Sequence, residues 1–197
     1  MSDIKNEYIF DSFTTKYGSV GSWAIWDPPG DKPKSNADGM NWVTPDLWKK
    51  VKTDYVFIGL NLSSTHGEQK EDDWRNFHSA SSRQNDYKLR YALTGTKYWG
   101  SYLTDLIKYF KQVDSGKVVK ALKEHPEIIV ENIKRLEEEL SYFPNKPVLV
   151  AMGAAVYKLL KDNLGSKYNI IKIKHYSCRM GKEKYREEVL ETLRNAE

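Results

Sequence analysis

The stretch at residues 55–60, Tyr-Val-Phe-Ile-Gly-Leu, decides the fold class of this chain. It is a short, continuous apolar run, typical of a strand that is buried on both faces of a parallel sheet. Residues 148–152 and 169–173 have the same character, and residues 22–26 read as a fourth strand or an edge hairpin. The sequence therefore predicts a mostly parallel, four-stranded sheet.

Amphipathic helical patterns lie between these strands. In the clearest of them apolar residues recur every three or four positions, at Ile129, Ile133, Leu136, Leu140 and Phe143. Residues 153–163 and 182–194 read as two further helices. Strands that alternate with helices predict an α/β fold, here a three-layer α/β/α sandwich.

The length of the chain and its cysteine content predict a single domain in a reducing compartment. A chain of 197 residues is long enough for one full core and short for two, so we expect a single domain over residues 1–197. The lone Cys178 cannot form an internal disulfide or a four-cysteine metal site. No signal peptide or membrane span is apparent, and the apolar strip of the 129–143 helix is explained by packing on the sheet. We expect a cytoplasmic monomer that does not bind membranes.

Charge and aromatic content leave the partner open. The net charge of +4 permits a polyanionic partner without requiring one. The 6 Trp, 13 Tyr and 6 Phe exceed what a core of this size needs, and residues 61–95, which have no sustained period, mix rings with lysines and arginines. Such a segment is typical of a nucleic-acid surface. Alternatively, its rings pack back onto the sheet.

Polar residues follow the apolar runs directly. Asn61 and Ser63 come after the first run, and His175 and Ser177 come after the third. Because ligands bind beyond the carboxyl ends of strands in open α/β sheets, we expect these side chains to converge on one pocket.

Several common site motifs are absent. The chain has no Gly-x-Gly-x-x-Gly after a strand, no Gly-Lys-Ser/Thr phosphate loop and no Gly-x-Ser-x-Gly elbow. The histidines are scattered, without a carboxylate cluster near them. We therefore expect neither a cofactor nor a metal site.

Four short segments together resemble a known family. They are VFIGLNLSS at 56–64, GSYLTDLIK at 100–108, VLVAMGAAVYKLL at 148–160 and HYS at 175–177. In this order they resemble landmarks of the uracil-DNA glycosylase superfamily, most closely its mismatch-specific branch. The resemblance covers roughly residues 54–180. It implies a uracil-DNA glycosylase-like fold and a DNA-repair enzyme that hydrolyses the N-glycosidic bond of a damaged or mispaired base flipped from DNA.

The resemblance also implies roles for individual residues. Asn61 would position the hydrolytic water, and His175 would stabilise the departing base. Phe77, or its rival Trp74, would stack on the extruded base, and Asp105 would read the base edge. Such chemistry needs hydrogen-bond donors at the base and a placed water, with no covalent nucleophile.

Four further residues complete the implied site. Gly59 and Leu60 would line the base pocket, and Ser63 and Ser177 would contact the phosphates beside the target nucleotide. An ionised Asp105 only accepts hydrogen bonds, so an active protein should prefer a base with donors at that edge over uracil.

The sequence departs from the family pattern at two turns. Leu62 and Tyr176 stand where the family has proline. Residues 99–110 also carry apolar residues at helical spacing, which would put Asp105 on a solvated helix face, whereas the resemblance predicts an extended segment. Periodicity favours the helix.

Three functions remain compatible with the sequence. The first is a DNA glycosylase acting on DNA or another nucleic acid. The second is a catalytically inactive module of the same fold that binds nucleic acid or a protein. The third, less favoured, is an unrelated α/β hydrolase or nucleotide-processing enzyme.

Overall fold

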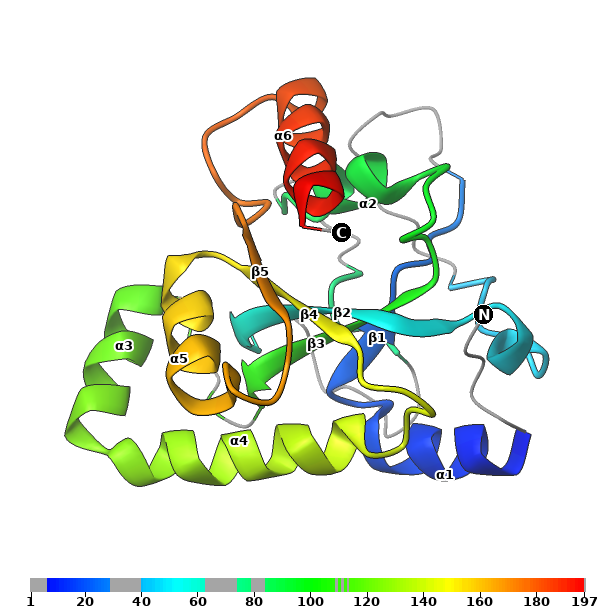
Figure 1. The fold of residues 1–197 in the computed structure, drawn as a ribbon. Helices are drawn as coiled ribbons and strands as arrows, with labels where there is room; N and C mark the ends of the chain where they lie inside the picture. Colours follow the sequence, from blue (N-terminus) through cyan, green and yellow to red (C-terminus); the bar gives the residue numbers. More distant parts are fainter. Residues whose placement is uncertain are drawn as a thin grey trace.

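The computed structural model of this chain describes residues 7–28, 40–62, 74–78, 84–108, 110, 112 and 114–196. It is an α/β fold (Figure 1). The helices are α1 (Glu7–Tyr17), α2 (Tyr87–Leu93), α3 (Ser115–Glu124), α4 (Pro126–Leu140), α5 (Ala154–Leu164) and α6 (Lys182–Asn195), with a 3-10 turn at Leu47–Lys49. The strands are β1 (Gly21–Trp23), β2 (Lys52–Asn61), β3 (Ser101–Ile107), β4 (Val148–Met152) and β5 (Ile170–Ile173).

The five strands form one mixed sheet in the order β1-β3-β2-β4-β5. Strands β3, β2, β4 and β5 are parallel neighbours, and β1 pairs antiparallel with β3 at the edge. The prediction of four strands is therefore wrong. The general α/β class is confirmed, and the additional strand is β3.

Strand β3 corrects the helical interpretation of residues 99–110. All seven of its residues are buried, and it runs parallel to β2 with Asp105 opposite Gly59. Leu103 packs in the core on one face of the sheet, while Tyr102 and Leu106 pack in the core on the other. A strand that is apolar on both faces shows no alternation, and its apolar residues then fit a helical spacing by coincidence.

Helices cover both faces of the sheet (Figure 1). On one face α1, α3, α4 and α5 pack over alternate strand residues such as Val56 and Ile58. On the other face α2 and α6 pack over Phe57 and its neighbours. The fold therefore has three layers. Among the described residues, none of the helices combines the length and apolar character that a bilayer crossing requires.

Many of the aromatic residues fill the core. Trp74 is 1% exposed and its ring lies against those of Phe10, Phe13, Trp23 and Tyr102. This packing removes Trp74 as a candidate for stacking on a base. Trp74 therefore follows the alternative expectation, in which a ring of the 61–95 segment packs back onto the sheet.

Candidate functional site

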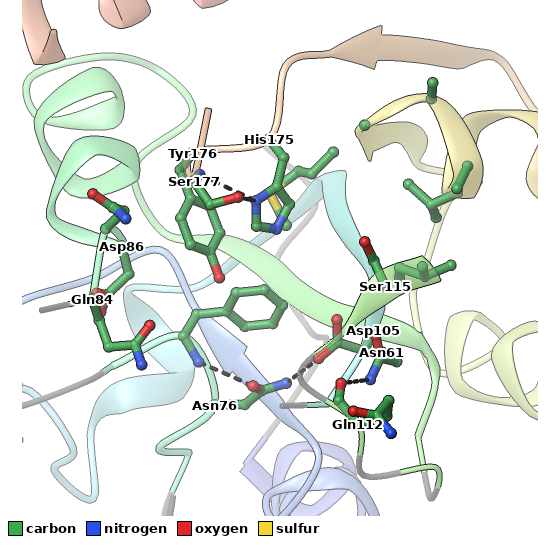
Figure 2. A pocket seen from close by; sticks show the side chains of 18 residues that line it. Asn61, Asn76, Gln84, Asp86, Asp105, Gln112, Ser115, His175, Tyr176 and Ser177 are labelled. Atoms are coloured by element: carbon green, nitrogen blue, oxygen red, sulfur yellow. Dashed lines mark hydrogen bonds between the residues drawn. The ribbon is translucent and has the colours of Figure 1, made fainter. Parts of the chain in front are cut away.

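A pocket of about 500 Å³ opens at the carboxyl ends of the parallel strands (Figure 2). Strand β2 contributes Leu60 and Asn61, and β3 contributes Asp105. Gly153 follows β4, and His175 lies just beyond β5. The pocket thus lies at the edge of the sheet where the sequence predicts a ligand site.

The structure brings most of the predicted site residues together. The pocket is lined by Leu60, Asn61, Phe77, Asp105, His175 and Ser177. Gly59 does not line it but lies directly beneath Asp105, as described below. Ser63 lies outside the described residues, so its predicted phosphate contact has no structural counterpart here.

The side-chain amide of Asn61 is held in one orientation. Its Nδ2 donates to the carbonyl oxygens of Leu62 at 3.2 Å, Phe110 at 3.2 Å and Gln112 at 2.7 Å. Three acceptors around Nδ2 fix which end of the amide is nitrogen. The described residues give no hydrogen bond to Oδ1, which is therefore available to accept one from a water molecule.

His175 is fixed as a neutral donor. Its Nδ1 lies 3.1 Å from the backbone nitrogen of Ser177 and 2.8 Å from the Ser177 hydroxyl oxygen. Because a backbone N–H can only donate, Nδ1 accepts and the ring proton is on Nε2. Desolvation in the pocket wall lowers the pKa of His175 to about 4, so the ring is neutral at pH 7. It offers Nε2–H to a ligand.

Asp105 is buried at the floor of the pocket, 4% exposed. Its Oδ2 accepts a hydrogen bond from Asn76 Nδ2 at 3.0 Å. Burial raises its pKa to about 6, and the bond from Asn76 and the nearby Lys108 charge act in the opposite direction. The carboxyl group is therefore mostly ionised at pH 7, but it takes up a proton in mildly acidic solution.

Gly59 gives Asp105 its room. A Cβ on residue 59 would lie 2.2 Å from Asp105 Oδ1 and 3.4 Å from Cε1 of the Phe77 ring. The first distance is far inside van der Waals contact, so a side chain on residue 59 and the present position of the carboxylate exclude each other. The pocket lining does not include Gly59, contrary to its predicted place there, and its effect on the site is the room that it gives Asp105.

A five-residue segment at positions 74–78 carries the aromatic wall. Trp74 and Phe77 both have left-handed backbone conformations, with φ of 51° and 65°. Bulky side chains rarely adopt this region, and such strain concentrates at functional sites. The buried ring of Trp74 anchors one end in the core, and Phe77 lines the pocket at the other.

Asn76 is a site residue that the sequence does not reveal. It lines the pocket, is 4% exposed, and bonds both to Asp105 and to the backbone nitrogen of Phe77. Its neighbours along the chain follow no period, and its partners come from a distant strand. We find no sequence signal that would have identified it.

Tyr176 forms part of the pocket wall. Its ring centroid lies 4.1 Å from that of His175 and 6.4 Å from that of Phe77, the latter pair edge-to-face at 76°. An aromatic ring thus lies beside two of the predicted site residues. His175, Tyr176 and Ser177 are seen together in Figure 2.

Two cations of the 61–95 segment serve the fold. Lys88 and Arg90 are buried on α2, and Lys88 Nζ donates to the carbonyl oxygen of Cys178 at 2.9 Å. Burial lowers the pKa of Arg90. Both side chains face inward, which is contrary to the expectation of a phosphate-binding surface at these two positions.

The first turn of α5 adds backbone N–H donors to the pocket. Ala154, Ala155 and Val156, the first turn of α5, line the pocket, and the N–H groups at a helix start lack helical acceptors.

Among the described residues, no group of three His, Cys, Asp or Glu side chains is arranged to hold a metal ion.

No protein-family model, curated protein or solved structure matches this chain. The pocket itself combines two aromatic rings, Phe77 and Tyr176, with a fixed donor at His175 and acceptors at Asn61 and Asp105. A planar, polar ring of nucleobase size fits this combination.

Proposed function

We propose that this protein is a DNA glycosylase-like enzyme that hydrolyses the N-glycosidic bond of a base flipped out of DNA. The observation that carries the proposal is that Asn61, whose Oδ1 accepts no hydrogen bond from the described residues, and His175, with its proton on Nε2, line one pocket. The proposed enzyme has the uracil-DNA glycosylase-like fold. It acts as a cytoplasmic monomer on DNA or another nucleic acid, without a cofactor.

The two side chains have complementary tasks in this reaction. As the bond between C1′ and the base nitrogen breaks, its electron pair moves to the base, and positive charge develops on the sugar. His175 Nε2–H donates a hydrogen bond to the base as negative charge develops there. A neutral imidazole with a pKa of about 4 acts as a donor and keeps its proton.

Asn61 places the water that completes the hydrolysis. Its Oδ1 accepts a hydrogen bond from a water molecule, which attacks C1′ and releases one proton to solvent. The departing base anion takes up a proton from solvent. An amide cannot remove a proton at neutral pH, so its contribution is the position of the water.

The walls of the pocket suit an extruded base. Phe77 and Tyr176 provide ring surfaces for stacking, and the start of α5 adds a favourable field for the developing anion. Extrusion of a base from the stack costs a few kcal/mol, which stacking in such a pocket offsets.

Base release from oligonucleotides tests the proposal. Single- and double-stranded substrates with uracil, cytosine, hypoxanthine, adenine or methylated purines are incubated with the wild type, Asn61→Ala and His175→Ala. Loss of a positioned donor or water should slow release by about 100- to 1,000-fold. Oligonucleotide binding, measured by fluorescence anisotropy, should change much less.

Asn163→Ala is a matched control, because the Asn163 side chain is exposed on α5 and, within the part of the chain that the structure describes, bonds only to the Leu159 carbonyl oxygen. It should release bases at the wild-type rate. A wild type that binds oligonucleotides but releases no base would establish the alternative, a catalytically inactive binding module. Wild-type release rates in both Asn61→Ala and His175→Ala would overturn the assigned roles.

A further inference from the structure

Asp105 presents one bound oxygen and one open oxygen. Oδ2 accepts from Asn76 at 3.0 Å, whereas the described residues give no hydrogen bond to Oδ1. The side chain is 4% exposed and lines the pocket, and its Oδ1 lies over the bare Cα of Gly59. An acceptor that faces a cavity and receives no hydrogen bond from the described residues is available to a donor on a ligand.

Asn76 determines which atom of residue 105 is open. Its Nδ2 donates to the carbonyl oxygen of Val20 at 2.8 Å and to Asp105, and its Oδ1 accepts from the backbone nitrogen of Phe77 at 3.1 Å. A carbonyl only accepts and a backbone N–H only donates, so the amide cannot turn over. Residue 105 must therefore present an acceptor to Asn76.

The pocket also offers the opposite polarity. His175 presents Nε2–H from beyond β5, and in Figure 2 His175 and Asp105 lie on different sides of the pocket. A ring that carries a carbonyl oxygen near the glycosidic bond and an amine on its far edge matches both groups. Cytosine-type bases have this pattern, whereas uracil has a carbonyl oxygen at both places.

We propose that Asn76 and Asp105 form a specificity-determining pair that selects a cytosine-type base with an exocyclic amine over its oxo counterpart. Asp105 contacts the base, and Asn76 is a positioning residue that acts through Asp105 and through the backbone of Phe77. This inference rests on the proposed function, because it names the substrate class of the same pocket.

The physical reason is the polarity of Oδ1. An ionised carboxylate only accepts, so an amine gains a charge-assisted hydrogen bond, while a carbonyl oxygen brings a second set of lone pairs against the anion. With a pKa of about 6, the Asp105 carboxyl group is ionised in most molecules at pH 7. No described residue supplies Oδ1 with a competing donor.

The substitution that tests this base selectivity is Asp105→Asn. Because Asn76 requires an acceptor, the new amide should place its oxygen toward Asn76 and its NH₂ group toward the pocket. The open atom then becomes a donor, and the preference should invert in favour of the oxo base. In Asp105→Asn combined with Asn76→Ala, the amide is free to turn, and the inversion should disappear.

The experiment measures release of cytosine and of uracil from otherwise identical single-stranded oligonucleotides at pH 7. Wild type should favour cytosine by about tenfold or more, the usual effect of one charge-assisted hydrogen bond. Asp105→Asn should favour uracil, and Asn76→Ala should lower the wild-type preference. Asn163→Ala should keep it, and circular dichroism checks that each variant is folded.

Failures of the two proposals are distinguishable. Release of uracil at or above the rate of cytosine by wild type, or an unchanged preference in Asp105→Asn, overturns the inference while glycosylase activity stands. If no oligonucleotide loses a base, the proposed function fails. In that case free cytosine and free uracil are titrated into the protein, and binding is followed by NMR. Binding of cytosine about tenfold tighter than uracil supports the inference, and equal or tighter binding of uracil overturns it.

Discussion

Two buried carboxylates lie against opposite faces of β3, and their surroundings differ. Glu139, from α4, is 0% exposed, and its Oε1 accepts from the hydroxyls of Tyr102 at 2.5 Å and Thr104 at 2.9 Å. Its Oε2 pairs with Lys108 Nζ at 2.5 Å. Asp105, on the other face, receives one hydrogen bond, from Asn76, and no described cation forms an ion pair with its carboxylate.

The difference separates a carboxylate that serves the fold from one that is prepared for a ligand. The charge of Glu139 is compensated by Lys108 and by two hydroxyl donors, and this carboxylate does not line the pocket. Asp105 is also buried, but one of its oxygens faces a pocket, and burial without full compensation raises its pKa.

The largest expected effect comes from breaking the Lys108–Glu139 pair. Lys108→Met leaves the Glu139 charge buried without its counter-ion, which should lower the free energy of unfolding by about 3–5 kcal/mol. Urea unfolding followed by circular dichroism measures it. Adding Glu139→Gln removes the charge but keeps an acceptor for Tyr102 and Thr104, so the double variant should regain part of the loss. A single variant as stable as the wild type would contradict the assignment.

The next effect is the dependence of stability on pH that Asp105 causes. The folded pKa of about 6 exceeds the ordinary value of 3.8, so between these two pH values the folded protein holds a proton that the unfolded chain has released. Asp105 therefore lowers stability progressively as the pH rises from about 4 to about 6, and fully above that. Below about pH 4 the cost is absent.

Asp105→Asn should remove this cost while keeping the bond to Asn76. We expect it to stabilise the protein at pH 7 by up to about 3 kcal/mol, and to have no such effect below about pH 4. Thermal or urea unfolding across this range is the measurement. A stability gain that is equal at pH 4 and pH 7 would show that the charge of Asp105 is not its source.

The smallest of the three effects is steric. Gly59→Ala places a Cβ 2.2 Å from Asp105 Oδ1, so the carboxylate must move, at a cost of about 1–3 kcal/mol in unfolding free energy. In an Asp105→Ala background the obstructing atom is gone, and the same change should cost much less. Equal costs in the two backgrounds would place the strain elsewhere.

Much of the fold was predictable because three strands are continuous apolar runs. Residues 148–152 match β4, and residues 55–60 and 169–173 overlap β2 and β5. Strand β3 was not predictable in this way, because burial on both faces removes the alternation of apolar and polar residues that marks a strand. Helix α2 was not predicted either. Two of its seven residues, Lys88 and Arg90, are charged but buried, so its buried face does not appear as an apolar periodicity in the sequence.

The site was predictable only where position in the fold determines it. Asn61 and His175 lie directly after buried strands, so the rule for open α/β sheets placed both at the pocket. Asn76 follows no strand, and its importance comes from contacts with Val20, Phe77 and Asp105. Contacts of that kind exist only in three dimensions and leave no periodic trace in the chain.

The segment at 74–78 also ties the pocket to the beginning of the described chain. Trp74 N donates to Gly18 O at 2.9 Å, Ser22 Oγ donates to Trp74 O at 2.7 Å, and Asn76 Nδ2 reaches Val20 O at 2.8 Å. Residues that share so many contacts open together in hydrogen exchange, as one cooperative folding unit. The ring of Phe77 and the amide of Asn76 should therefore share the local stability of α1 and β1, although neither element contributes a residue to the pocket lining.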